Sequence, residues 1–469
     1  MESGKSRKKA NTMIQLKKDF LPRLKGTYII GGSIRDLLLG RTPIDYDIAV
    51  TGNPEKFAKK IIAKSAGHFV RIGKPGQMIF RVISADTIFD ITPLNGISIE
   101  DDLKKRDFTI NAIAYDLFSE KIIDCLGGLQ DLAGRKIRMI SMEIFKKDPV
   151  RLIRAYRIAA CLNFEIEPQT AGTIKLNARL LKNIPGERIR AELFTMLDAS
   201  KSYPYLSQMA DSGLLFTIFP DLGRLKGCDQ NNYHHFDVFE HTMRAYRHLE
   251  TMLNDPGKVL PDTSIKIRQY LNENRKALIK CAILLHDIGK PLVKTLDRNS
   301  KYHFYGHARK GADMAEKIGQ RLRFSNHEKE FVDHIIRNHM KPLSLFTAYE
   351  KKTLTQKGVS RFYKKCGDLA PALLLVATAD IKAKKDKISQ KNMGFISFIQ
   401  KMIHDYFYVF QPLNQEPPLI TGHDLIHMFG LTPSPLFKKI LNLVDEAKFA
   451  DTINNRSEAI KLVRDYLKK

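Results

Sequence analysis

The sequence contains no tryptophan and only five cysteines in 469 residues. The cysteines are scattered, odd in number and never spaced as Cys-x-x-Cys, so neither a disulfide framework nor a thiolate zinc site is expected. No apolar run reaches the roughly 18 residues of a transmembrane helix, and the basic N-terminus lacks the apolar core of a signal peptide. These absences favour a soluble, cytoplasmic protein.

Acidic residues are the minority charge. Lys and Arg number 77 against 51 Asp and Glu, a formal net charge of +26. The excess is spread along the chain, which suits a long polyanion better than a small acidic substrate. A basic membrane-surface protein is the competing interpretation, but no amphipathic anchor stands out. The chain is too long for one core, so we expect roughly two to four domains.

The first candidate site lies in YIIGGSIRDLLLGRTPIDYDIAV, residues 28–50. A β-branched run meets Gly31 and Gly32, a helix-like segment follows, and the next glycine ends it. Asp45 and Asp47 are then embedded in a second apolar run. Because side chains alternate along a strand, both carboxylates should point to the same face.

Two adjacent carboxylates repel each other unless a counter-charge is present. Mg²⁺ explains them because it takes carboxylate oxygens together with substrate phosphates; a hairpin edge with solvated aspartates is the plainer alternative. The glycine turn favours the metal, since its backbone can approach a phosphate, Ser33 opens a helix with unpaired N–H groups, and Arg35 adds a cation. A phosphate cradle beside paired carboxylates predicts nucleotidyl transfer.

GGSIRD followed by DYDIAV resembles the head of the bacterial (class II) tRNA nucleotidyltransferase and poly(A) polymerase family. The later run RDFTINA, which starts at Arg106, resembles the second head motif of that family. The resemblance implies that Arg106 and Asp107 contact the ribose and phosphates of the nucleotide and that Asn111 shapes the pocket. Without it, Arg106 and Asp107 are an ordinary charge pair at a helix start. Asp45 and Asp47 become the catalytic ligands of Mg²⁺.

The segment DPVRLIRAYRIAACL places Arg151, Arg154 and Arg157 along one helix face. A solvated basic stripe is the plain interpretation; the resemblance implies nucleotide binding by all three. In the family an Asp-x-x-Arg pair reads the incoming base, and Asp148 and Arg151 occupy those places. A carboxylate accepts from the amino group shared by cytosine and adenine, and a guanidinium donates to ring acceptors. The family usually has Glu before this Asp, where the chain has Lys147.

Asp90 lies in TIFDI, a strand-like run that we expect beside Asp45 and Asp47. A third carboxylate of the site and a plain strand-end aspartate are both open. Only 16 positions separate Asp90 from Arg106, where complete CCA-adding members carry a longer, flexible loop thought to help the pocket switch from CTP to ATP. A short loop is typical of members that add only the two cytidines, although short-loop relatives of other specificity exist.

A second constellation of histidines and aspartates occupies the middle of the chain. Its members, in order, are His241, His286, Asp287, His307, His339 and Asp380. A single helical histidine is usually structural, but this number of imidazoles and carboxylates is typical of borderline metals such as Mn²⁺, Ni²⁺, Co²⁺ or Fe²⁺.

The order resembles the HD-domain phosphohydrolases over about residues 234–385. The resemblance implies metal ligation by His241, His286, Asp287 and Asp380, with His307 and His339 at optional extra positions and Lys290 near the phosphate. A metal there would activate water for attack on a phosphoester.

The expected fold is an α+β head with a mixed sheet, followed by an all-α neck, HD body and tail. The expected domains are a basic arm (1–26), the nucleotidyltransferase head (27–140), the neck (141–232), the HD metal phosphohydrolase domain (233–385) and a helical tail (386–469). In the neck, GERIRAEL resembles a further family motif in which Glu187 and Arg190 hold the neck helices and Arg151. The tail, by the resemblance, binds tRNA through its phosphates.

The favoured function is template-independent addition of C, A or both to the tRNA 3′ end from CTP and ATP, with two cytidines only as the short-loop hypothesis. The HD domain would act on 2′,3′-cyclic phosphates or phosphomonoesters at RNA ends. Poly(A) polymerase shares the head motifs and is the first alternative. An HD phosphodiesterase whose head only binds RNA, and a non-catalytic RNA-binding protein, are the others. Monomer and homodimer both remain open.

Overall fold

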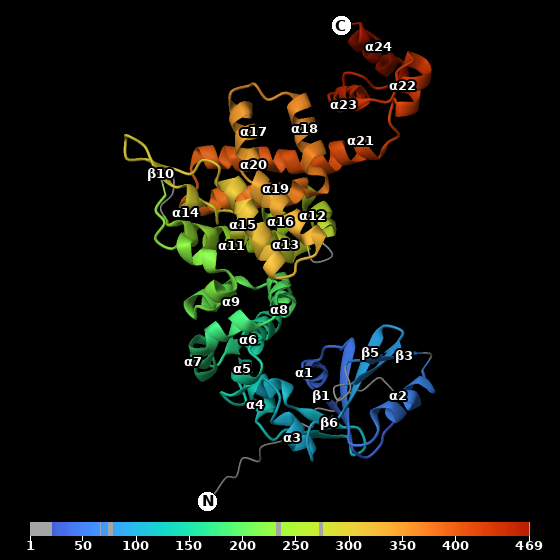
Figure 1. Ribbon diagram of the computed structural model, residues 1–469, viewed down its shortest axis with the longest axis vertical. Coiled ribbons are helices and arrows are strands. Elements are labelled where there is room, and N and C mark those ends of the chain that lie inside the picture. The colour runs from blue at the N-terminus through green and yellow to red at the C-terminus, as the bar shows by residue number, and fades with distance from the viewer. Residues whose placement is uncertain (1–20, 66, 74–77, 231–235, 272–274, 469) are drawn as a thin grey trace, which may run out of the picture. The chain divides into compact units, whose positions relative to one another are not determined.

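The computed structural model describes residues 21–65, 67–73, 78–230, 236–271 and 275–468 (Figure 1). Most of the predicted basic arm therefore lies outside the described residues. The chain divides into two compact units, Met1–Ile184 and Pro185–Lys469. This division falls inside the segment predicted as the neck.

The first unit contains a seven-stranded mixed sheet. In spatial order the strands are β3 (His68–Ile72), β4 (Ile79–Ser84), β5 (Thr87–Pro93), β2 (Asp45–Val50), β1 (Thr27–Ile30), β6 (Ala114–Asp116) and β7 (Lys121–Ile123). Strands β2 and β5 pair in parallel, and all other neighbours are antiparallel. The predicted strand runs all appear, and the mixed sheet confirms the expected α+β head.

Alternating side chains give the sheet two different faces. Tyr46 and Ile48 of β2 point into a core with Phe89 of β5 and with Phe57 of α2 (Pro54–Ile62). The opposite face is covered at β1 and β6 by a smaller cluster, and this same face carries the aspartates of β2. The predicted shared face of these aspartates is therefore present.

Short helices connect the sheet to the end of the first unit. They are α1 (Gly32–Leu38), α3 (Ile99–Leu103), η1 (Thr109–Asn111), α4 (Gly128–Ala133), α5 (Ile144–Lys147), α6 (Arg151–Leu162), α7 (Pro168–Asn177) and η2 (Ala178–Asn183). A two-stranded pair, β8 (Lys136–Ile137) and β9 (Glu165–Ile166), lies among them.

The second unit is built almost wholly from helices, as predicted. Its α-helices are α8 (Gly186–Asp198), α9 (Tyr203–Asp211), α10 (Leu214–Ile218), α11 (Val238–Asn254), α12 (Ser264–Tyr270), α13 (Arg275–Leu285), α14 (Lys290–Val293), α15 (His307–Arg321), α16 (Asn326–Asn338), α17 (Lys341–Glu350), α18 (Gln356–Cys366), α19 (Ala370–Ala383), α20 (Gln390–Asp405), α21 (Gln411–Gln415), α22 (Gly422–Phe429), α23 (Pro435–Phe449) and α24 (Arg456–Leu467). A small hairpin, β10 (Thr295–Leu296) and β11 (Tyr302–His303), interrupts them. Among the described residues, no helix is both long and apolar enough to cross a membrane.

Helices α13 and α19 form the centre of the second unit and are apolar on almost every side. One exception is Lys280 of α13, whose side chain is 1% exposed. Its ammonium donates to the carbonyl of Ala199 at 2.8 Å, the hydroxyl of Ser202 at 3.0 Å and the carboxylate of Glu250 at 2.9 Å. A buried ammonium needs such partners, and these tie α13 to α11 and to the start of α9.

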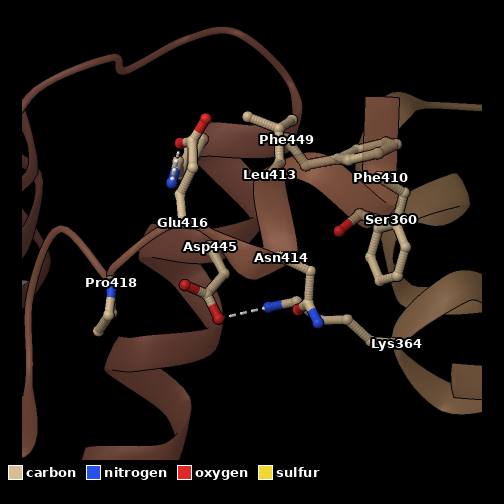
Figure 2. A pocket seen from close by; sticks show the side chains of 10 residues that line it. Ser360, Lys364, Phe410, Leu413, Asn414, Glu416, Pro418, Asp445 and Phe449 are labelled. Atoms are coloured by element: carbon tan, nitrogen blue, oxygen red, sulfur yellow. Dashed lines mark hydrogen bonds and ion pairs between the residues drawn. The ribbon is translucent and has the colours of Figure 1, made fainter. Parts of the chain in front are cut away.

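A small cavity of about 170 Å³ lies between α18, α21 and α23, with Phe410 and Phe449 on its wall (Figure 2). At its rim Lys364 donates to Asp445 at 2.7 Å. All five cysteines are free thiols: Cys125 and Cys161 of the first unit are exposed, and the three in the second unit are buried.

Candidate active sites

The turn between β1 and α1 passes between two charged groups. Gly31 has φ +73° and ψ −140°, a conformation that favours glycine. A Cβ placed there would lie 2.9 Å from Asp47 Oδ2 and 2.9 Å from Arg106 Nη1. Backbone, carboxylate and guanidinium therefore meet around one residue, as a site for phosphate and metal requires.

The hydroxyl of Ser33 is buried beneath this turn. It donates to the carbonyl of Ile30 at 2.8 Å and accepts from the amide of Asp47 at 3.4 Å. The hydroxyl thus connects α1 to β1 and β2. A contact between Ser33 and a nucleotide would have to use the backbone amide, which sequence reasoning did not distinguish from the hydroxyl.

Asp45 and Asp47 share the open face of β2, and Asp90 of β5 is paired in register with Asp47. Surrounding protein raises the pKa of Asp47; Arg106 opposes this effect, while Asp90 and Asp45 add to it. A divalent cation would remove that repulsion. The expected position of Asp90 beside Asp47 is correct, but its carboxylate receives two hydrogen bonds from Arg81, each 2.7 Å long.

Asp107 and Asn111 do not face outward but hold the arginines of the site. Arg35 Nη1 donates to Asn111 Oδ1 at 2.8 Å, and Asn111 Nδ2 donates to Asp107 Oδ1 at 2.9 Å. Arg154 Nη1 donates to Asp107 Oδ2 at 3.2 Å. Burial alone would raise the pKa of Asp107, but Arg154 and the hydrogen bonds outweigh it and lower the pKa. Asp107 is therefore a fixed anion between Arg35 and Arg154.

The predicted base-reading pair lies where α5 meets α6. Arg151 Nε is 3.9 Å from Asp148 Oδ2, and its Nη1 donates to the carbonyl of Arg106 at 3.4 Å. Arg157 follows on the same helix and is partly buried. Lys147, the departure from the family pattern, ends α5 with an exposed side chain. Its charge is therefore solvated next to the pair.

The six predicted HD residues come together from three helices, α11, α15 and α19, from the C-terminal end of α16 and from the turn after α13. His241 Nε2 lies 2.8 Å from Asp380 Oδ1 and 3.7 Å from Asp287 Oδ2. His286 Nε2 is 3.2 Å from Asp287 Oδ2. On the other side of Asp287, its Oδ1 is 3.4 Å from His307 Nε2 and 3.8 Å from His339 Nε2.

Three of these histidines have the same orienting contact. The Nδ1 atoms of His286, His307 and His339 each lie 2.7–2.8 Å from a backbone carbonyl three residues earlier. This contact favours the tautomer with its proton on Nδ1, in which Nε2 offers a lone pair to a metal ion. Metal-binding histidines commonly have this arrangement. The Nε2 atoms of His307 and His339 are only 3.1 Å apart. Two lone pairs at that distance repel each other unless a cation lies between them.

The ligand atoms form two groups that share one aspartate: His241, His286 and Asp287, and Asp287, His307 and His339, with ligand atoms within 4.8 Å in each group. The donor set therefore fits borderline divalent metals. Lys290 lies 2.6 Å from Asp287 and also donates to Gln230 at 2.7 Å.

Sequence reasoning did not single out Arg81 or Gln230. Arg81 is one cation within a strand, and only the register of β4 against β5 shows its partner. Arg190 is expected to hold the neck and Arg151; the structure pairs it with Glu328, which completes the capping box of Ser325 at the start of α16 in its own unit.

Comparison with known proteins finds family matches over both the head and the HD region. Residues 27–138 match the poly A polymerase head domain, residues 163–225 match the probable RNA- and SrmB-binding site of polymerase A, and residues 238–382 match the HD domain.

Two curated relatives cover nearly the whole chain. The A-adding tRNA nucleotidyltransferase of Deinococcus radiodurans is 30% identical over 94% of this chain and 95% of its own. The CC-adding tRNA nucleotidyltransferase of Thermus thermophilus is 28% identical over 93% and 92%. The Thermotoga maritima CCA-adding enzyme, solved in complex with tRNA, shares the fold with a TM-score of 0.61 over 94% of this chain and 91% of its own, at 21% identity.

The mixed sheet, the glycine turn and the paired aspartates define a nucleotidyltransferase, to which an HD domain is joined. The match to the Deinococcus relative over almost both full lengths identifies the family. The chain belongs to the tRNA nucleotidyltransferase and poly(A) polymerase family.

Proposed function

We propose that the protein adds nucleotides to the 3′ end of tRNA from CTP, ATP or both, without a template. The observation that carries the proposal is the meeting of Gly31, Asp47 and Arg106 around one turn. The names of the two curated relatives, A-adding and CC-adding tRNA nucleotidyltransferases, supply the substrate class. A cytoplasmic location is part of this proposal.

In this proposal the triphosphate lies against Gly31 and Gly32, with Arg35 and Arg106 as its cations. Asp45 and Asp47 hold Mg²⁺, which when bound lowers the pKa of the tRNA 3′-hydroxyl and stabilises charge on the departing pyrophosphate. The hydroxyl attacks the α-phosphorus in line, so no side chain needs to form a covalent bond.

The base is proposed to contact Asp148 and Arg151. An Asp carboxylate accepts from the exocyclic amino group of cytosine or adenine, and the Arg donates to the adjoining ring acceptor. Guanine and uracil present the opposite pattern there. The two side chains lie near each other at the α5–α6 junction, and the Arg is anchored on the carbonyl of Arg106. Arg154 and Arg157 continue the same helix face.

The nucleotide preference is proposed to be CTP, with addition of two cytidines. The connection from β5, which ends at Pro93, to α3, which starts at Ile99, is short. A longer loop at this place is the feature associated with the switch to ATP. The relatives include both A-adding and CC-adding enzymes, so the length of the product decides the question.

The HD domain is proposed to hydrolyse phosphoesters at RNA ends. His241, His286, Asp287 and Asp380 would hold one divalent metal, with His307 and His339 on the far side of Asp287 for a second. Such a metal, when bound, supplies a hydroxide at neutral pH. Lys290, fixed between Asp287 and Gln230, would neutralise the phosphate oxygens.

The test of the head uses tRNA that lacks its 3′ CCA and, separately, tRNA that ends in CC, with Mg²⁺ and CTP, ATP or both, and products sized to one nucleotide. Growth by two residues with CTP, and no more with both, establishes CC addition. Growth by three with both contradicts the short-loop argument, one A on a tRNA ending in CC gives A addition, and a long A tail with ATP alone indicates poly(A) polymerase.

Asp47→Asn should abolish all addition and leave hydrolysis of a nucleoside 2′,3′-cyclic phosphate intact. Asp287→Asn should do the reverse. If Asp47→Asn retained full addition, the head proposal would be wrong. If neither the wild type nor any added divalent metal gave hydrolysis, the HD proposal would be wrong.

A further inference from the structure

A row of charged side chains crosses the open face of the head sheet. Arg81 of β4 is paired in register with Asp90 of β5, which is paired in register with Asp47 of β2. Directly paired residues lie on the same face of a sheet. The intervening residues Phe80 and Phe89 point to the opposite face, into the core. Arg81 therefore shares its face with the carboxylates proposed to hold metal.

Asp90 fixes the Arg81 side chain but engages only part of its hydrogen-bonding capacity. Its Nε and Nη2 each donate to one oxygen of Asp90 at 2.7 Å. A guanidinium has five N–H groups in a fixed fork, so three remain for another acceptor. The Arg81 side chain is 35% exposed and that of Asp90 is 19% exposed. The carboxylate thus presents the arginine to solvent at the edge of the site.

The geometry of the proposed reaction indicates that the acceptor RNA approaches the aspartates from the β5–β4 side of the sheet. The phosphate cradle of Gly31, Arg35 and Arg106 lies on the β1 side of the aspartates, whereas β5 and β4 lie on the other side. In-line displacement places the attacking hydroxyl opposite the leaving pyrophosphate. The RNA 3′ end must therefore arrive from the β5–β4 side. Among the described residues, Arg81 and Asp90 on that side keep part of their side-chain surface exposed, while at β1 and β6 the face is covered by the cluster of Ile30 and Leu103.

We propose that Arg81 binds a phosphate of the terminal nucleotide of the acceptor RNA and that Asp90 positions Arg81 for this contact. The proposal rests on the nucleotidyl transfer proposed above. A planar guanidinium suits the task because it can hold a carboxylate and a phosphate at once. Asp90 then serves the acceptor through Arg81 instead of binding metal itself.

The experiment compares Arg81→Met with Arg71→Met in addition of CTP to tRNA lacking CCA. Arg71, on β3, points to the opposite face and pairs with Glu55, so its variant removes the same charge from the same sheet away from the site. In Arg81→Met the KM for RNA should rise about tenfold or more, as expected for a charge-assisted hydrogen bond, with the KM for CTP unchanged. The slope of log Kd for RNA against log salt should fall by about 1. Arg71→Met should match the wild type, and Arg81→Lys should lie between.

Asp90→Asn separates the two possible roles of that carboxylate. As a positioning residue, it should raise the KM for RNA as Arg81→Met does and keep kcat within a few-fold of the wild type. Loss of kcat at saturating RNA in Asp90→Asn, with Arg81→Met unaffected, would make Asp90 a metal ligand and overturn the inference. If Arg81→Met and Arg71→Met were both active and had equal KM values for RNA, the inference about Arg81 would be overturned and the proposed nucleotidyl transfer would stand. A wild type that adds no nucleotide would overturn the proposed transfer, and this inference with it.

Discussion

Alanine at Gly31 should destroy the head site without preventing folding. The new Cβ would lie 2.9 Å from both Asp47 Oδ2 and Arg106 Nη1, so each of these atoms must move by several tenths of an ångström. Both are ends of side chains, and the protein can accommodate them by displacing the site. Misplacement of reacting groups by about 1 Å costs on the order of 100-fold in rate. Because the expected displacement is smaller than this, we expect kcat/KM for CTP in Gly31→Ala to fall by about 10- to 100-fold.

Gly40 supplies the matched control. It also has a positive φ, +72° against +73° at Gly31, but no atom lies within 4 Å of its Cβ position. Each substitution should cost about 1–3 kcal/mol of stability through backbone strain, measured by urea unfolding. Only Gly31→Ala should lose addition, measured with CTP and tRNA lacking CCA at 25 °C. Similar activity in the two variants would refute the geometry assigned to the turn.

Three further predictions concern the second unit. Lys280→Met should destabilise it by about 3–5 kcal/mol in urea unfolding, because the buried Glu250 loses its counter-charge, and adding Glu250→Gln should recover part of the loss. Burial, together with nearby cations, lowers the pKa of His248 to about 4, whereas in the unfolded chain the same imidazole takes up a proton below about pH 6.5. The stability of the folded protein should therefore fall as the pH drops from about 6.5 to about 4. Over that range the melting temperature of His248→Gln should fall less than that of the wild type. Mn²⁺ at about 100 times its Kd should stabilise the protein by about 2.7 kcal/mol, an effect that Asp287→Asn abolishes and Asp47→Asn keeps in thermal melts.

Local patterns predicted the parts of the head that lie close together in the chain. The strand, glycine turn and helix of residues 27–38 follow from a β-branched run, two glycines and a helical segment, and the helix differs by one residue from the expected start at Ser33. The shared face of Asp45 and Asp47 follows from strand alternation alone. The residues of the HD site lie far apart in the chain, and their types and order were enough to predict them, because binding one metal requires imidazole and carboxylate ligands wherever they stand in the sequence.

What the sequence does not show is register and side-chain direction. The arginine that holds Asp90 comes from a neighbouring strand, so its identity depends on how β4 pairs with β5. Asp107 and Asn111 were expected at the nucleotide, but their side chains point to Arg35 and Arg154. The hydroxyl of Ser33 likewise points inward, to the carbonyl of Ile30. In each case a tertiary contact selects one of several uses that the residue type allows.

The distribution of the thiols makes the protein ready for site-selective labelling. Both exposed cysteines, Cys125 and Cys161, belong to the first unit, whereas Cys228, Cys281 and Cys366 are buried in the second. A brief exposure to a maleimide dye should therefore mark the nucleotidyltransferase unit of the natural sequence. A second dye on an introduced surface cysteine of the HD unit would then let energy transfer follow the two units through successive rounds of nucleotide addition.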